Sequence, residues 1–195
     1  MIKICACFII CALSLGIVFA QEVSGMKKAV MIIAAQDFRD EELFVPKGIL
    51  EKSGIEVKVA STTLKQAKGI LGGTIKPDIL VNDINVRDFD AIIFVGGGGA
   101  SLYWDDPVSH KLALDALSNN RILAAICIAP VTLAKAGVLN GKRATVWPSE
   151  SAELTSRGAN YTGRPVEKDG NIITASGPAA AAEFADELVK TLFNR

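Results

Sequence analysis

Short runs of consecutive apolar residues recur along the chain and predict strands that are buried on both faces. The clearest runs are Ala29–Ala34, Ala91–Val95 and Ile122–Ile126, none of which contains a charged residue. Uninterrupted runs of this kind are typical of parallel sheets covered on both sides, because every side chain of the strand then faces a protein interior. Further short strands are expected at Glu56–Ala60, Ala144–Trp147 and Asn171–Ala175.

Segments with helical spacing of apolar residues separate these runs. Helices are expected at Glu41–Ser53, Pro107–Ser118, Ile128–Ala136 and Ala179–Phe193, and Lys65–Val81 predicts a hairpin-like excursion. Strands that alternate with helices predict an α/β fold, in which a mostly parallel sheet carries helices on both faces. In such folds a ligand site lies beyond the carboxyl ends of the strands, where the strand order reverses.

A different pattern occupies the start of the chain. Met1–Ala20 has one cation followed by the apolar run Ile4–Phe19, with small residues at positions −3 and −1 of a cut before Gln21. This pattern is typical of a secretory signal peptide. The run falls short of the roughly 20 residues that span a bilayer, so an uncleaved anchor is the less favoured alternative. We expect a signal peptide (residues 1–20), one domain (residues 21–195), and a periplasmic or secreted protein without stable membrane anchoring.

Composition and charge narrow the function classes. The 195 residues carry 21 Lys+Arg and 21 Asp+Glu, for a formal net charge of zero. No basic excess is available to attract nucleic-acid phosphates, so we expect no nucleic-acid partner. With 50% hydrophobic and 22% charged residues, the chain has the composition of a globular protein and not of a disordered one.

Cysteine usage draws attention to one position. The chain has four cysteines, and Cys5, Cys7 and Cys11 lie in the predicted signal peptide. The mature chain would keep Cys127 alone, so it could form no internal disulfide. A single thiol in an exported protein suggests a reactive group or an intermolecular pair. The alternative is an inert cysteine in the core, since free cysteine is among the most buried residue types.

The surroundings of Cys127 favour the reactive interpretation. In the segment ILAAICIAP, a buried strand passes directly into Cys127 and then into a predicted helix. This order resembles a nucleophile elbow, although the G-x-S-x-G letters are absent. A helix N-terminus stabilises a thiolate, so we expect the pKa of Cys127 to lie below the free-thiol value of about 8.5.

A second feature follows the Ala91–Val95 strand. Gly96–Gly99 is a run of four glycines, whose backbone can approach a ligand closely and point N–H groups at it. The amides of Gly97 and Ile128 are candidates for an oxyanion hole. A phosphate-binding loop is the competing interpretation, but no G-K-[ST] follows the glycines. A flexible turn would also explain a glycine run.

A third feature follows the first strand. Asp40, Glu41 and Glu42 open a predicted helix, and acids in a first turn can simply complement the helix dipole. Glu42 is the candidate for more, because its strand and that of Cys127 would end at the same edge of the sheet. We expect the Glu42 side chain to lie against Cys127 and to share a proton with it, raising the carboxyl pKa and lowering the thiol pKa.

These features, in this order, resemble the ThiJ/PfpI superfamily, which has a class I glutamine amidotransferase-like fold. The resemblance runs from Lys27 to Phe193 and rests on DFRDEELFVP, FDAIIFVGGGGAS and AAICIAPVTLAKAGVL. It implies a flavodoxin-like three-layer α/β sandwich that forms a homodimer or higher homo-oligomer. It also implies Cys127 as nucleophile, Glu42 as its carboxyl partner, and Gly97 with Ile128 as oxyanion donors. Thiol chemistry on a carbonyl at these residues needs no metal, and we expect no cofactor.

The chain departs from the family pattern at its histidines. Protease-like members carry His directly after the nucleophile, where this chain has Ile128. Other members have T-H-P across the site, where this chain has Val146-Trp147-Pro148, so that Trp147 becomes a candidate substrate-contacting residue. The one histidine of the chain, His110, is expected to be solvated on a surface helix. A Cys–His scheme would therefore lack its base.

Three functions remain open. The favoured one is an enzyme that acts on small reactive carbonyls through a Cys127 hemithioacetal, with glyoxalase-like or deglycase-like chemistry. The second is a cysteine peptidase or amidase acting on a peptide-like substrate, which the missing histidine disfavours. The third is a non-enzymatic redox-sensing or chaperone-like oligomer, in which an accessible thiol oxidises.

Overall fold

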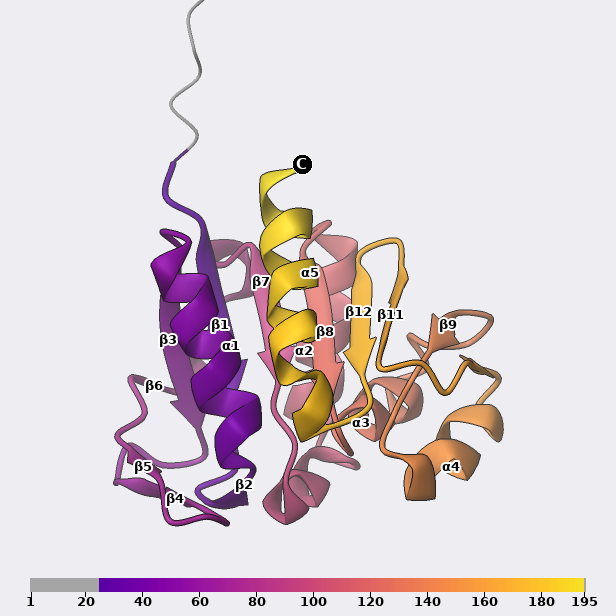
Figure 1. Ribbon diagram of the computed structural model, residues 1–195, viewed down its shortest axis with the longest axis horizontal. Helices are drawn as coiled ribbons and strands as arrows, with labels where there is room; N and C mark the ends of the chain where they lie inside the picture. Colours follow the sequence, from indigo (N-terminus) through magenta and orange to yellow (C-terminus); the bar gives the residue numbers. More distant parts are fainter. Residues whose placement is uncertain (1–24, 195) are drawn as a thin grey trace, which may run out of the picture.

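The computed structural model describes residues 25–194, and the predicted signal peptide lies outside this part of the chain. A seven-stranded sheet with the order β11-β12-β8-β7-β1-β3-β6 forms the centre of the molecule (Figure 1). All its neighbouring strands are parallel except the antiparallel pair β11–β12. Its strands are β1 (Lys28–Ile32), β3 (Glu56–Ser61), β6 (Ile79–Leu80), β7 (Ala91–Phe94), β8 (Ile122–Ile126), β11 (Val166–Asp169) and β12 (Ile172–Ala175).

Helices cover both faces of this sheet. In Figure 1, α1 and α5 lie side by side in front of the strands, and α2 and α3 lie behind them. The helices are α1 (Asp40–Lys52), α2 (Pro107–Ser118), α3 (Pro130–Lys135), α4 (Ser151–Thr155) and α5 (Ala181–Phe193). The predicted three-layer α/β sandwich with a mostly parallel sheet is therefore confirmed.

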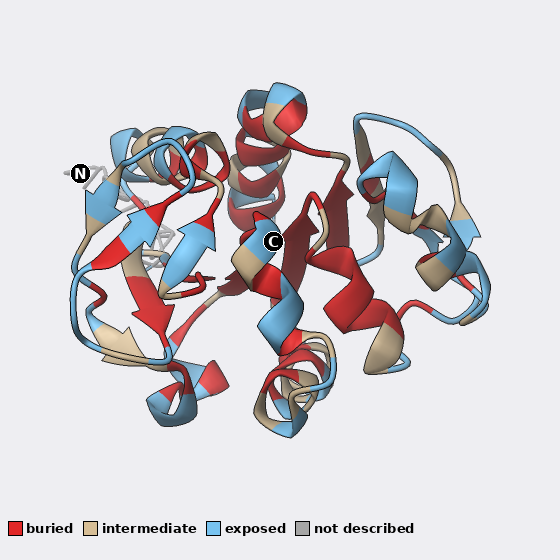
Figure 2. Ribbon diagram, turned by 90° about the horizontal axis from the view of Figure 1, so that it is seen from below, coloured by how far each residue is buried: buried red, intermediate tan, exposed pale blue. Residues whose placement is uncertain are grey.

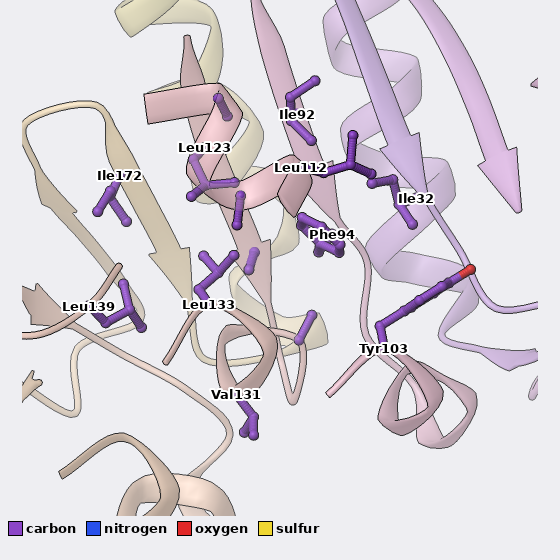
Figure 3. Packing of buried hydrophobic residues seen from close by; sticks show 14 of the residues in the cluster. Ile32, Ile92, Phe94, Tyr103, Leu112, Leu123, Val131, Leu133, Leu139 and Ile172 are labelled. Carbon is purple, nitrogen blue, oxygen red and sulfur yellow. The ribbon is translucent and has the colours of Figure 1, made fainter. Parts of the chain in front are cut away.

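Side-chain alternation along the strands divides the core into two halves. In β1, Ala29 and Met31 face the α1–α5 layer, whereas Val30 and Ile32 face the opposite layer. The half on the α2–α3 side is shown in Figure 3, where Ile32, Ile92 and Phe94 pack towards Leu112. In Figure 2 the central strands are largely buried, and exposed residues lie on the outer faces of the helices and on outlying loops. The two clusters pack on opposite faces of the sheet.

Two small sheets lie outside the central one. β2 (Gln36–Phe38), β4 (Ala67–Gly69) and β5 (Thr74–Ile75) form the first, and β9 (Arg143–Ala144) pairs with β10 (Asn160–Tyr161) in the second. The β4–β5 pair is antiparallel, as the predicted excursion at Lys65–Val81 requires. The strand expected at Ala144–Trp147 is shorter than predicted and belongs to the second small sheet.

Strand order reverses between β1 and β7. The chain adds β3 and β6 on one side of β1, then returns to add β7, β8 and β12 on the other side. The loops that follow β1, β7 and β8 consequently meet at one place on the sheet edge, the position at which open α/β sheets hold ligands. Within residues 25–194, no helix has both the length and the apolar character needed to cross a bilayer.

Candidate active site

Cys127 lies directly after β8 in a left-handed backbone conformation, with φ +64°. For a residue with a Cβ atom this conformation costs roughly 1 kcal/mol or more, so the surroundings must hold it. They do so through both backbone polar groups. The Cys127 N–H donates to the carbonyl of Ala175 at 2.9 Å, and its carbonyl accepts from the Trp147 N–H at 2.8 Å. The direction of the Cys127 side chain is therefore set by β12 and by the segment that carries Trp147.

The helix after Cys127 begins later than expected. The predicted helix Ile128–Ala136 is observed as α3, Pro130–Lys135, and Cys127–Ala129 form a turn before it. Proline lacks the backbone donor that a helix interior needs and favours the first helical position, which explains the boundary. The sulfur thus precedes a helix of six residues, and the helix dipole gives it less support than the sequence suggested.

The glycine loop after β7 brings the carboxyl and the thiol together. The Gly96 N–H donates to Glu42 Oε2 at 3.1 Å, and the Gly96 carbonyl accepts from the Arg39 N–H at 3.0 Å. A Cβ on Gly96 would lie 2.5 Å from the Cys127 Cβ and 2.5 Å from Glu42 Oε2. Only glycine fits at this position, so the loop serves close approach and is more than a flexible turn.

Glu42 projects from the first turn of α1 and is fully buried. Its side chain lies against the Cys127 side chain, as the strand-end argument predicted. Its Oε1 atom has no hydrogen-bond partner among the described residues. Burial raises the pKa of Glu42 to about 7, although the bonds from Cys127 and Gly96 and the Arg39 charge oppose this shift.

The expected direction of the Cys127 pKa shift is wrong. Burial, followed by the nearby Glu42 charge, raises the pKa of the thiol to about 12. The backbone N–H groups of Gly97 and Ile128 face the sulfur and lower the pKa of the thiol, but they do not outweigh burial. Because the two groups are in contact, they titrate as a pair that releases its first proton near pH 7.

A cavity of about 210 Å³ opens above this pair. It brings together all five candidate site residues, namely Glu42, Gly97, Cys127, Ile128 and Trp147. The roles assigned to these residues stay predictions, whereas their proximity is a feature of the structure. Trp147 is 42% exposed and forms part of the cavity wall.

The cavity also contains residues that sequence reasoning missed. These are Arg39, Ile70, Gly98 and Pro178. Pro178 follows β12, a strand of the central sheet, so its position at the strand end was a usable signal. Arg39 follows β2, a strand of the first small sheet that the sequence pattern did not predict. Ile70 belongs to the loop between β4 and β5, and no pattern in the sequence places that loop beside the site.

His110 does not contribute to the cavity. It lies in α2, half-buried, and its Nε2 contacts the backbone carbonyl of Trp104 at 2.7 Å. The expectation that it is solvated therefore needs correction, because a backbone partner holds the ring. Among residues 25–194, no cluster of three or more His, Cys, Asp or Glu side chains could hold a metal ion.

Comparison with known sequences identifies relatives over most of the domain. The model of the DJ-1/PfpI family matches residues 27–191. A Methanocaldococcus jannaschii protein is 43% identical over 85% of this chain and 82% of its own length. A Pyrococcus abyssi protein named a deglycase is 31% identical over 84% of this chain and 98% of its own length. A Caenorhabditis elegans protein named a glutathione-independent glyoxalase is 29% identical over 87% of this chain and 90% of its own length.

Comparison with solved structures agrees. The crystal structure of a ThiJ/PfpI domain protein from Brachyspira murdochii superposes with a TM-score of 0.85 at 34% identity. The match covers 86% of this chain and 97% of that one. A sheet with the site at its reversal point, a buried carboxyl against a strained cysteine, and these sequence matches lead to one assignment: the chain belongs to the DJ-1/PfpI family.

Proposed function

We propose that this protein is a cofactor-independent enzyme that converts small α-oxoaldehydes into α-hydroxy acids through a covalent adduct on Cys127. The observation that carries this proposal is the contact between the Glu42 carboxyl and the Cys127 thiol beneath a small cavity. Relatives named glyoxalase and deglycase support the same class of chemistry. Both names concern carbonyl groups that a thiol can attack.

The first step needs a base next to the thiol. The Glu42 carboxylate accepts the Cys127 proton as the sulfur adds to the aldehyde carbon, and the product is a hemithioacetal. The N–H groups of Gly97 and Ile128, which already face the sulfur, donate to the oxygen on which negative charge develops. This assignment gives a proton acceptor to a site that has no histidine among its lining residues.

The second step is an internal redox exchange. Glu42 first passes the thiol proton to the alkoxide oxygen of the adduct, which completes the hemithioacetal and restores the carboxylate. The carboxylate then removes the hydrogen of the former aldehyde carbon as a proton, and the electron pair forms an enediol. Reprotonation at the adjacent carbon gives a thioester of the hydroxy acid. Water then cleaves the thioester and restores the thiol, so that methylglyoxal plus water yields lactate. One carbon is oxidised and its neighbour reduced, and no external oxidant or reductant is needed.

Product analysis with matched variants tests the proposal. Purified protein should form lactate from methylglyoxal, and Cys127→Ala should abolish it. Glu42→Gln keeps the shape of the side chain but cannot accept the thiol proton, so turnover should fall by about 10²–10⁴-fold. The rate should increase as the pH rises through about 7, where the pair loses its first proton. Equal lactate formation by wild type and Cys127→Ala would refute the proposal.

A further inference from the structure

We propose that Trp147 determines substrate specificity and that the site prefers uncharged α-oxoaldehydes with an apolar or aromatic arm. This inference rests on the proposed function, because it names the substrate class of the same cavity. The basis is geometric: a partly exposed indole, packed against Gly177, stands in the wall of a mainly apolar cavity beside the Cys127 sulfur.

The wall of the cavity is mainly apolar. Ile70, Ile128, Trp147 and Pro178 line it above Cys127. A two-carbon dialdehyde would leave this wall in contact with water, whereas a substrate with a hydrophobic arm would cover it. Each methylene-sized group bound in such a pocket is worth about 10-fold or more in specificity.

The charged residues of the cavity argue against an anionic substrate. Arg39 is the one cation among the lining residues, and its guanidinium is already engaged by Glu41, with Nε at 2.9 Å and NH2 at 3.1 Å from the carboxylate. A substrate carboxylate would have to displace Glu41 and would also face Glu42. An uncharged substrate avoids both costs.

The position of the Trp147 ring is set from two sides. Its backbone N–H is bonded to the Cys127 carbonyl at 2.8 Å. On the other side lies Gly177, where a Cβ would come within 2.7 Å of the indole. The ring is therefore packed against backbone while 42% of the residue stays exposed. A fixed aromatic surface with a free face is suited to stacking on a planar substrate arm.

Specificity constants for a substrate series provide the first test. Wild type should use phenylglyoxal about 10-fold better than methylglyoxal, and glyoxylate should be the poorest substrate. Trp147→Ala should lower kcat/KM for phenylglyoxal about 10-fold, mainly through KM, and should lower kcat/KM for methylglyoxal by a smaller factor, so that the preference for the aromatic substrate is lost. Trp147→Phe keeps an aromatic face and should retain most of the preference. Circular dichroism shows whether each variant is folded.

Thiol alkylation provides a readout that does not depend on turnover. The rates of Cys127 with N-phenylmaleimide and N-methylmaleimide are divided by the rates of the same reagents with glutathione. The normalised ratio should favour the phenyl reagent about 10-fold in wild type and fall towards one in Trp147→Ala. Trp147→Phe should again lie close to wild type.

The two readouts separate the two proposals. A ratio near one in wild type, or an unchanged ratio in Trp147→Ala, overturns the inference about Trp147 even if methylglyoxal is consumed. If no dicarbonyl is turned over but the alkylation ratio depends on Trp147, the proposed function fails and the apolar recognition stands.

Discussion

At the residue scale, the contact between Glu42 and Cys127 is the central feature of the candidate site. Sequence reasoning placed the carboxyl against the thiol, which the structure shows, but expected the wrong direction for the thiol pKa. The expectation considered only the helix dipole and the proton shared with Glu42. Burial is the largest cause of the raised pKa of both Glu42 and Cys127. The sequence pattern predicts which residues lie side by side, but it does not predict how far burial removes them from water and so shifts their pKa values.

Burial of Glu42 makes stability depend on pH. Its pKa is raised from 4.5 to about 7 in the folded protein, so the folded state holds a proton that the unfolded state has released over this range. Stability should thus fall as the pH rises from about 4.5 to about 7, by roughly 3 kcal/mol. Urea denaturation at several pH values measures this change.

Glu42→Gln is the matched control for the pH dependence. Glutamine preserves the volume and has no proton to lose, so the decline between pH 4.5 and 7 should be largely absent. An equally steep decline in Glu42→Gln would mean that other groups are responsible. A wild type of constant stability would mean that Glu42 is ionised as easily in the folded chain as in the unfolded one.

At the scale of elements, the segments that follow the strands form the candidate site, and the buried faces of the helices pack into the core. The Gly96–Gly99 loop belongs to the candidate site because the backbone of Gly96 lies where a side chain would separate Glu42 from Cys127. The sequence left three interpretations of this loop open, and the deciding fact was a contact with residues distant in the chain. No local pattern contains that information.

Two glycines of this loop, Gly96 and Gly98, should differ in their tolerance of a side chain. Gly96→Ala should destabilise the protein by about 1–3 kcal/mol, because its Cβ would clash with the Cys127 Cβ and Glu42 Oε2. It should also alter the pH at which Cys127 alkylation reaches half its maximum rate. Gly98→Ala is the control, since a Cβ there meets no atom within 4 Å. Equal stability losses in the two variants would contradict the close-approach argument.

A buried leucine of helix α5 should contribute more to stability than an exposed leucine of α2. Leu188 is fully buried between α5 and the sheet, so Leu188→Ala should lower the free energy of unfolding by about 2–5 kcal/mol. Leu114 on α2 is 50% exposed, so Leu114→Ala should change the free energy of unfolding by no more than about 0.5 kcal/mol. Chemical denaturation of both variants gives the comparison, and similar values would show that α5 is not part of the cooperative core.

At the scale of the whole molecule, the site exists because the strand order reverses. The segments that follow β1, β7 and β8 meet at this point, although Glu42 and Cys127 are far apart in the chain. Export and homo-oligomer formation also concern the whole molecule and stay predictions. Light scattering of purified protein would give the oligomer mass directly.

Export has a defined molecular outcome. If Met1–Ala20 is a cleaved signal peptide, material recovered from outside the cytoplasm should begin at Gln21. N-terminal sequencing or intact mass determines the first residue. Replacing apolar residues of Ile4–Phe19 by charged ones should keep the protein inside the cell. Full-length protein that stays in the cytosol would contradict the prediction and leave Cys5, Cys7 and Cys11 in the functional chain.

The sequence by itself determined the fold class, most strand and helix positions, and the candidate residues Glu42, Gly97, Cys127 and Ile128. It could do so because burial on both faces of a parallel sheet produces uninterrupted apolar runs, and because strand ends share one edge. Only the tertiary structure decided the start of α3, the raised thiol pKa, and the place of Arg39 and Ile70 in the cavity. These depend on desolvation and on contacts between distant segments, and both arise only when the chain has packed.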